Sequence, residues 1–445
     1  MKIYLIILSF VLAASALAQD RSDEFNLVEC LAYARENSPT HKKFELIQMQ
    51  SDARIKIERS KFLPQVNAYT DYQQFFEIPT FIFPANEGEI LSSGSSEGEY
   101  PVRIGQEFNL FAGARISQTL FDKRWMSTKQ ALELNSEMLQ LRERSVEEEL
   151  AMKISQAFFE VEKLQIQMDL VDSNINKLSE VLSVLRLQYS NGVLKKSELQ
   201  KMELSIGRLS ANKDRISGAI AVRVAQLKFM MGMPDDQNLS ISPEGYDLDE
   251  LVAQSSGSPS LEIALFENRL RSGEVNIKSV ADSYFPKVKA FADFQFQAQR
   301  SSFNFLSDEK WHPRHVLGVG INVPIFTGFE KKGRIQLEEI KVDEVALEKE
   351  NAEKKARLNL NNRANEMRFS EQAVQNEKAN KELSDELYRQ VLLEYEQGVS
   401  TVSDLILASI QQIEASNQYE EAIFDYKLAQ MNYLKASSGL GVLFP

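Results

Sequence analysis

The sequence has little of several residue types on which common structural and catalytic sites depend. It holds one cysteine, Cys30, and three histidines, His41, His312 and His315. A single cysteine excludes an internal disulfide framework, and Cys30 lies too far into the chain to be the lipid-bearing cysteine of a lipoprotein. Only His312 and His315 are neighbours, which is a weak basis for a metal site. We therefore expect no metal and no cofactor.

Catalytic motifs are also missing. Gly318-Val-Gly320 lies in an expected strand and lacks the rest of a phosphate-binding loop. No G-x-S-x-G sequence occurs. The many acidic residues fall mostly on expected helices, where a solvated face is the ordinary explanation. The sequence predicts a protein that is not an enzyme.

Long apolar runs are absent after the amino terminus. Lys2 precedes the run IYLIILSFVLAASA, and Ala16-Leu17-Ala18 follows the pattern of a cleavage site. We expect residues 1–18 to be a signal peptide, cut before Gln19, and no later transmembrane helix, because none reaches the ~18 apolar residues needed. The formal net charge of −13 makes nucleic acid an improbable partner. The chain is expected to be exported and not lipidated at its amino terminus.

Short phrases occur twice in the same order. YSNGVLKKSEL (189–199) matches YEQGVSTVSDL (395–405) at five of eleven positions. FLPQVNAYTDYQQ (62–74) resembles YFPKVKAFADFQF (284–296), and ISQTLFD (116–122) resembles INVPIFT (321–327). Two structural repeats are therefore predicted, at 19–231 and 258–445, joined by the segment 232–257, which is rich in Gly, Pro, Ser and Asp.

Heptad patterns predict long helices at 122–190 and 328–395, each followed by a return helix, to 231 and over 401–437. Shorter helices are expected at 26–60 and 259–283. The first seam runs through apolar or aromatic residues in a 4-3 rhythm, which favours a left-handed coiled coil: Leu150, Ile154, Ala157, Val161, Leu164, Met168, Val171, Ile175, Leu178, Leu182, Leu185 and Tyr189. In the second half the seam is patchier, and Ile406, Ile410 and Ile413 fit it.

Each repeated phrase is interpreted as the turn of an antiparallel helical hairpin. Gly192 and Gly398 would supply the left-handed residue that closes a helix. Ser197 and Ser403 are the expected N-caps of the return helices. The matched helix lengths place both turns, 189–199 and 395–405, at the same end of a long rod.

Four segments alternate apolar and polar residues at period two, predicting strands at about 64–76, 103–121, 286–298 and 315–327. One apolar and one charged face over ~10 residues is typical of a transmembrane β-strand; a half-buried sheet in a soluble protein is the alternative. The connections 77–102 and 299–314 would face the cell exterior. Four strands are too few for a closed barrel, so other copies of the chain must complete it.

At this point the residues resemble those of the outer-membrane efflux proteins, the TolC-like channel-tunnels. The resemblance rests on NLVECLAYARENSPTHKK (26–43), the two strand starts, ISQTLFD, VPIFTGFEKKG and the paired turns. It implies a mostly α protein with a transmembrane β part: a trimer with a shared 12-stranded barrel and an α-helical tunnel through the periplasm. It also implies a passive exit duct of a tripartite efflux or type I secretion system in the outer membrane. A periplasmic adaptor and an inner-membrane pump, of the resistance-nodulation-division or ABC type, would be its partners.

The resemblance also suggests residues for the tunnel's closing and docking. Glu198 and Asp404 match acidic gate positions, and Tyr395 matches a gate tyrosine. Ser400 and Leu407 depart from the family's best-known latch, so that latch cannot be reproduced here. Three copies of each carboxylate near a threefold axis would repel one another and favour cations; alternatively both are ordinary first-turn acidic residues. The expected adaptor contacts are Tyr189, Gly192, Val193, Gly398 and Val399.

Two other classes stay open on the sequence alone. A periplasmic coiled-coil adaptor would also be exported, although it would carry one hairpin rather than two. A structural envelope protein without a pore would share the long helices. The sequence does not indicate the cargo or the class of pump.

Overall fold

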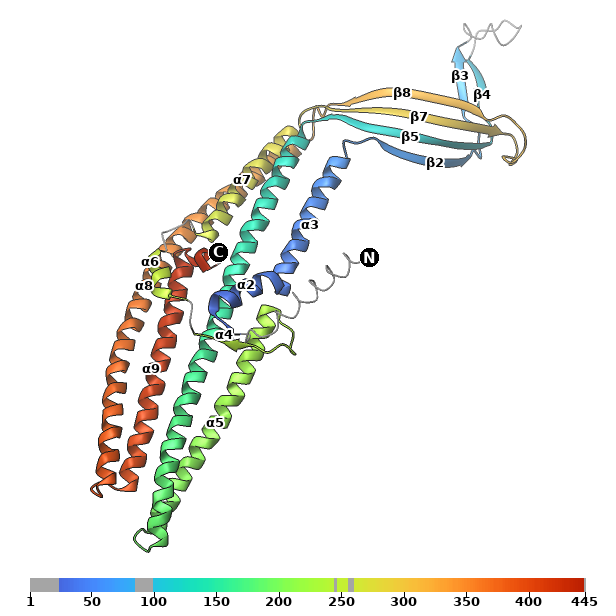
Figure 1. Ribbon diagram of the computed structural model, residues 1–445. Coiled ribbons are helices and arrows are strands. Elements are labelled where there is room, and N and C mark those ends of the chain that lie inside the picture. Colours follow the sequence, from blue (N-terminus) through green and yellow to red (C-terminus); the bar gives the residue numbers. More distant parts are fainter. Residues whose placement is uncertain (1–23, 85–98, 244–245, 255–259, 444–445) are drawn as a thin grey trace, which may run out of the picture. The chain divides into compact units, whose positions relative to one another are not determined.

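The computed structural model describes residues 24–84, 99–243, 246–254 and 260–443. The expected signal peptide lies outside these residues. The chain divides into two compact units. The first contains the described parts of 1–48, 137–269 and 345–445, and the second contains those of 49–136 and 270–344. Figure 1 shows their helices and strands.

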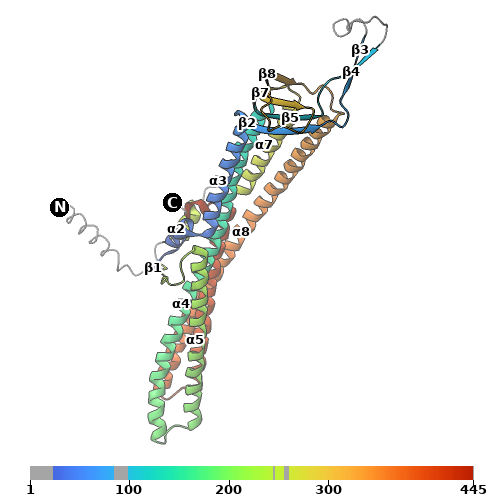
Figure 2. The same cartoon turned by 90° about the vertical axis from the view of Figure 1, so that its right-hand side faces the viewer.

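Helices dominate the chain. Two of them, α4 and α8, have 67 residues each, which corresponds to about 100 Å of helix. Each turns back into a helix about half as long, and Figure 2 shows α4 and α5 lying side by side up to their common turn. We call α4–α5 hairpin 1 and α8–α9 hairpin 2. The helices are α2 (Leu27–Asn37), α3 (Pro39–Ser60), α4 (Arg124–Ser190), α5 (Lys196–Met231), α6 (Leu248–Gln254), α7 (Leu261–Asp282), α8 (Glu330–Glu396) and α9 (Val402–Ala436), with a 3-10 turn at Leu440–Leu443.

The amino-terminal helix is broken, although the sequence pattern predicted one helix over 26–60. Asn26 and Glu29 form a capping box that starts α2. The helix ends at Ser38, whose backbone is extended with ψ 132°, because a residue before proline avoids the helical region. Pro39 then opens α3, and the Ser38 hydroxyl accepts a hydrogen bond from the Thr40 N–H.

The predicted seam of hairpin 1 is confirmed by burial. Ile154, Ala157, Val161, Val171, Leu178, Leu182 and Leu185 are all buried. Leu150, Leu164, Met168 and Ile175 are only half-buried, and Tyr189 is 41% exposed. In hairpin 2 the proposed register is wrong at Ile410, which is 40% exposed. The buried stripe of α9 instead follows Val402, Leu405, Ala408 and Ile413.

Polar pairs explain why the pattern of hairpin 2 is weaker. Gln412 is buried and donates a 2.7 Å hydrogen bond to the Asp385 carboxylate. Ser409 is also buried and lies 3.4 Å from the Asn174 side-chain oxygen. These buried polar side chains have hydrogen-bond partners, so polar residues occupy positions where a heptad pattern would show apolar ones.

The main core of the first unit joins the middle of the helices near α2. Its largest buried members are Leu27, Leu31, Ile154, Phe158, Phe159, Leu227, Met231 and Met431. Cys30 lies in the same core, and its burial raises the pKa of its thiol to about 12. Beside this core Lys427 donates to both oxygens of Glu162, at 2.8 and 2.7 Å. The short parallel pair β1 (Glu24–Phe25) and β6 (Ser240–Ile241) flanks it.

The second unit contains an antiparallel sheet in the order β2-β5-β7-β8. Its strands are β2 (Gln65–Gln74), β5 (Phe108–Asp122), β7 (Lys287–Arg300) and β8 (His312–Asn322). Strand β8 was predicted to continue to 327. It ends before Pro324, which has no N–H for the ladder.

The first-half strand predicted over 103–121 also needs correction. Residues 104–107 are not in a strand, so β5 begins only at Phe108. The expected connection 77–102 contains a separate hairpin of β3 (Thr80–Pro84) and β4 (Glu99–Arg103). Prolines in both strands, Pro84 and Pro101, weakened the strand signal there.

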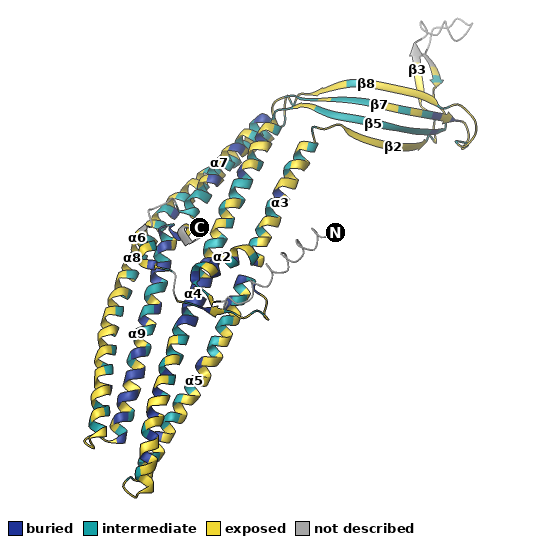
Figure 3. Ribbon diagram, viewed as in Figure 1, coloured by how far each residue is buried: buried dark blue, intermediate teal, exposed yellow. Residues whose placement is uncertain are grey.

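The register places the predicted apolar residues on one face of the sheet. Ala112 pairs with Phe296, Ala114 with Phe294 and Ile116 with Ala292, and directly opposed residues share a face. This face is bare along β8, where Leu317, Val319 and Ile321 are 84%, 63% and 67% exposed. Figure 3 shows β8 coloured largely as exposed.

The other face of the sheet is polar. Arg115 and Asp293 form an ion pair at 2.6 Å, and the Tyr69 hydroxyl donates to the same carboxylate at 2.7 Å. None of the helices in the described chain is long and apolar enough to cross a membrane.

Candidate functional site at the two helical tips

The turn of hairpin 1 closes α4 with a left-handed glycine. Gly192 has φ +75°, which confirms its predicted role. Its N–H bonds to the Tyr189 carbonyl at 3.0 Å, and the Val193 N–H bonds to the Gln188 carbonyl at 2.9 Å. This pair of bonds is the Schellman motif, which satisfies carbonyls that a helix end leaves without partners.

The turn of hairpin 2 repeats this geometry. Gly398 has φ +76°. Its N–H bonds to the Tyr395 carbonyl at 3.0 Å, and the Val399 N–H bonds to the Glu394 carbonyl at 2.8 Å. The two phrases of the sequence are therefore two copies of one helix-ending motif.

The return helices start differently from the prediction. The N-caps are Lys195 and Thr401, not Ser197 and Ser403. Lys195 makes no side-chain capping bond. Thr401 makes a capping box with Asp404, in which its hydroxyl accepts from the Asp404 N–H. Each serine lies one residue inside its helix, because the chain turns helical earlier than expected.

Asp404 serves as the other half of this cap. One of its carboxylate oxygens accepts from the Thr401 hydroxyl at 2.6 Å and from the Thr401 N–H at 2.9 Å. Hydrogen bonds to the charged form lower the pKa of Asp404, the Thr401 side chain first. The structure thus gives Asp404 a helix-starting role, and its gate role stays a prediction.

Glu198 connects hairpin 1 with hairpin 2 through a lysine. Lys201 donates to Glu198 at 2.9 Å and to the Ser403 hydroxyl at 2.9 Å. The Glu198 side chain is 24% exposed, and its second oxygen is buried without a hydrogen-bond partner in the described chain. The sequence showed the Glu198–Lys201 spacing, but no pattern in it indicated Ser403 as a partner.

An apolar cluster lies beneath these polar contacts and contains residues from both hairpins. Its buried members are Leu178, Leu182, Leu185, Met202, Tyr388, Val402, Leu405 and Ala408. Tyr395 packs against it, and desolvation raises the pKa of the Tyr395 phenol. The two tips therefore lie at the same end of this unit, as predicted, and Figure 1 shows them together.

Between the hairpins is a cavity of about 950 Å³. Both turns contribute to its wall, including Val193, Glu198, Lys201, Tyr395, Gly398 and Ser403. Val193 and Val399 are 79% and 73% exposed. Bare apolar side chains on otherwise polar turns are a feature of contact surfaces.

The histidine pair considered above does not form a chelating site. His312 and His315 are three residues apart on β8, so their side chains project to opposite faces. His315 lies against the rings of Phe294 and Phe296 instead, with centroids 5.5 and 5.9 Å away.

Comparison with known proteins adds a family to this geometry. Residues 254–439 match the family model described as outer membrane efflux protein. Over this segment the chain is similar to outer membrane efflux proteins. The matched segment includes all of hairpin 2. A comparison with curated proteins found no match.

Solved structures of outer membrane channels share the fold of this chain. The outer membrane protein VceC from Vibrio cholerae has 12% identity and a TM-score of 0.66, over 92% of this chain and 95% of that one. The Campylobacter jejuni CmeC outer membrane channel has 12% identity and a TM-score of 0.67, over 93% and 85%. The open state of the Neisseria gonorrhoeae MtrE outer membrane channel has 18% identity and a TM-score of 0.66, over 92% and 88%.

Proposed function

We propose that this protein is the passive outer-membrane exit duct of a tripartite efflux or type I secretion system. It acts as a homotrimer whose helices cross the periplasm. A periplasmic adaptor joins its tips to an inner-membrane pump of the resistance-nodulation-division or ABC type, which supplies the energy.

The observation that carries the proposal is the unfinished sheet. In the described chain β2 and β8 each pair on one side only. Their free edges are 10 and 11 residues long, and one face between them is bare and apolar. Lipid cannot satisfy the backbone groups of an open edge. If β8 of each copy pairs with β2 of the next, three copies form a closed twelve-stranded barrel.

Cysteine crosslinking tests this closure. We would combine Val66→Cys on β2 with Leu317→Cys, Val319→Cys or Ile321→Cys on β8, because these residues lie on the same face. One combination is expected to form a disulfide between copies, which requires Cα atoms about 5.5 Å apart. The ladder of bands should end at a trimer. A ladder that ends at a dimer, or none with any pair, would contradict the proposed barrel. The native Cys30 is buried and does not interfere.

The exposed valines of the turns suit an adaptor. A photo-crosslinking amino acid at Val193 or Val399 should capture an adaptor in native membranes, identified by mass spectrometry. Val222, which lies on α5 and is 65% exposed, is the control away from the tip. Capture with a resistance-nodulation-division pump would mean small-molecule efflux, and capture with an ABC exporter would mean protein secretion. Equal labelling at Val193 and Val222 would argue against docking at the tips.

The gate assignment is tested by conductance. Replacing Glu198 and Asp404 together by alanine is expected to raise resting conductance in planar bilayers or to lower cation selectivity, because six carboxylates leave the entrance of the trimer. Unchanged conductance and selectivity would remove both residues from the gate. A protein with no conductance at all would instead be an adaptor or an envelope protein without a pore.

A further inference from the structure

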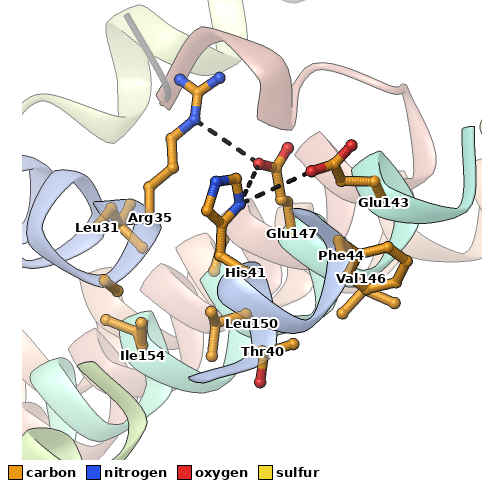
Figure 4. A pocket seen from close by; sticks show the side chains of 12 residues that line it. Leu31, Arg35, Thr40, His41, Phe44, Glu143, Val146, Glu147, Leu150 and Ile154 are labelled. Atoms are coloured by element: carbon orange, nitrogen blue, oxygen red, sulfur yellow. Dashed lines mark ion pairs between the residues drawn. The ribbon is translucent and has the colours of Figure 1, made fainter. Parts of the chain in front are cut away.

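A histidine and two glutamates meet where α3 begins beside α4. His41 lies in the first turn of α3, and Glu143 and Glu147 lie one turn apart on α4, so both carboxylates face the same side. His41 Nδ1 is 3.5 Å from a Glu147 oxygen and 3.8 Å from a Glu143 oxygen. Figure 4 shows the three side chains converging.

The surroundings leave room for one small ligand. The three side chains are only 22–25% exposed. They line a cavity of about 20 Å³, about the size that a single water or ion occupies. Its other walls are mostly apolar, with Leu31, Phe44, Val146, Leu150 and Ile154 among them.

Direct hydrogen bonding does not account for this arrangement. His41 Nδ1 is buried and has no hydrogen-bond partner in the described chain, since 3.5 and 3.8 Å exceed the usual 2.7–3.2 Å. Donor atoms around a tetrahedral zinc ion, with bonds of about 2.0–2.1 Å, lie roughly 3.4 Å from one another. The ligand atoms of all three residues fall within 4.8 Å of each other. The spacing therefore fits a shared ion better than a pair of hydrogen bonds.

We propose that His41, Glu143 and Glu147 bind a divalent transition-metal ion, with Zn²⁺ as the best match. One imidazole and two carboxylates are donors that zinc accepts, whereas Mg²⁺ and Ca²⁺ favour oxygen ligands alone. The ion fixes the first turn of α3 to α4. This proposal departs from the sequence-based expectation of no metal and is independent of the proposed transport function.

Arg35 is the competing cation. Its Nε lies 3.6 Å from the same Glu147 oxygen, and its side chain is 46% exposed, so it can turn into solvent when an ion binds. Zinc must therefore displace the Arg35–Glu147 ion pair when it binds, which lowers its affinity. Arg35→Gln removes the competitor and the like charge, and it is expected to tighten binding.

Calorimetric titration of the full chain, free of any histidine tag and stripped with chelator, tests the site with Zn²⁺ alone. We expect one ion per chain and a higher unfolding temperature with zinc, because the ion binds the folded state. His41→Gln and Glu147→Gln should each weaken binding at least tenfold, and Arg35→Gln should strengthen it severalfold. Glu149→Gln, an exposed carboxylate on α4 that pairs with Lys153, is the matched control and should bind like the natural protein.

Several results would overturn the proposal. One is the absence of stoichiometric zinc binding by the natural protein. Another is unchanged affinity in both Glu143→Gln and Glu147→Gln, which would place the ion elsewhere. Circular dichroism would establish that each variant is folded. If His41→Gln does not fold, Arg35→Gln still decides, because unchanged or weaker binding there contradicts the site. Displacement of Zn²⁺ by millimolar Mg²⁺ would also count against it.

Discussion

Replacing Lys201 by methionine isolates the polar link between the two hairpins. Methionine keeps most of the apolar stem of lysine and removes only the ammonium. The change deletes the 2.9 Å bond to Glu198 within hairpin 1 and the 2.9 Å bond to Ser403 in hairpin 2. It also leaves Glu198 partly buried without its cation.

The stability lost in Lys201→Met is estimated from the exposure of the Lys201 side chain. The Lys201 side chain is 50% exposed, so its ion pair contributes only about 0.5 kcal/mol after solvent screening. The bond from a charged donor to Ser403 contributes about 1 kcal/mol. Only the bond to Ser403 joins the two hairpins, so losing about 1 kcal/mol per chain corresponds to roughly a fivefold shift towards separated tips. In a trimer whose three links break together, the shift is about a hundredfold.

Two assays measure this shift. Hydrogen exchange of the α9 amides near Ser403 reports the link directly and is expected to speed up about fivefold. Single-channel recording reports the proposed gate, and its open probability distinguishes independent from concerted opening. Lys196→Met is the control, because Lys196 is exposed in the first turn of α5, five residues before Lys201. If Lys201→Met matches Lys196→Met in both assays, the reasoning about the link is wrong.

Three further predictions concern the helix ends and the core. Gly192→Ala or Gly398→Ala should destabilise the hairpins by about 1–2 kcal/mol in urea unfolding, because each φ is left-handed while a new Cβ meets open space; a cost near zero would contradict this. Lys427→Met should lower the free energy of unfolding by about 3 kcal/mol, because Glu162 is only 11% exposed and loses its cation. Adding Glu162→Gln should restore part of that stability, and a double variant no more stable than Lys427→Met would refute the pairing. The pKa of Asp404 is lowered in the folded protein, so its contribution is present above its unfolded pKa of about 3.9 and is lost as pH falls through the folded value. The difference in amide protection between the natural protein and Asp404→Asn should therefore vanish in acid, and a difference that persists there would have another cause.

The parts of the fold that could be predicted from the sequence are those with a local periodic pattern. Leu178, Leu182 and Leu185 follow a heptad, and they are buried. Gly192 and Gly398 end heptad runs and adopt the left-handed conformation. The sheet faces followed from alternation at period two. In each case neighbouring residues in the chain determine the structure.

The missed features depend on residues far apart or on competing signals. Lys201 and Ser403 are separated by 202 positions, and His41 meets Glu143 and Glu147 across two helices. No spacing rule connects such residues before the fold is known. The β3–β4 hairpin was missed because proline argues against a strand. Ser197 and Ser403 were plausible caps, but Lys195 and Thr401, each two residues earlier, adopt the cap conformation.

The free edges of β2 and β8 make the newly synthesised chain prone to aggregation. An exposed strand edge with apolar neighbours pairs readily with any other strand, which is the usual start of aggregation. In the proposed trimer, a single copy in transit would need an escort until its partners arrive. Folding and assembly would then be one concentration-dependent event, so the amount of mature protein should fall more steeply than the rate of synthesis.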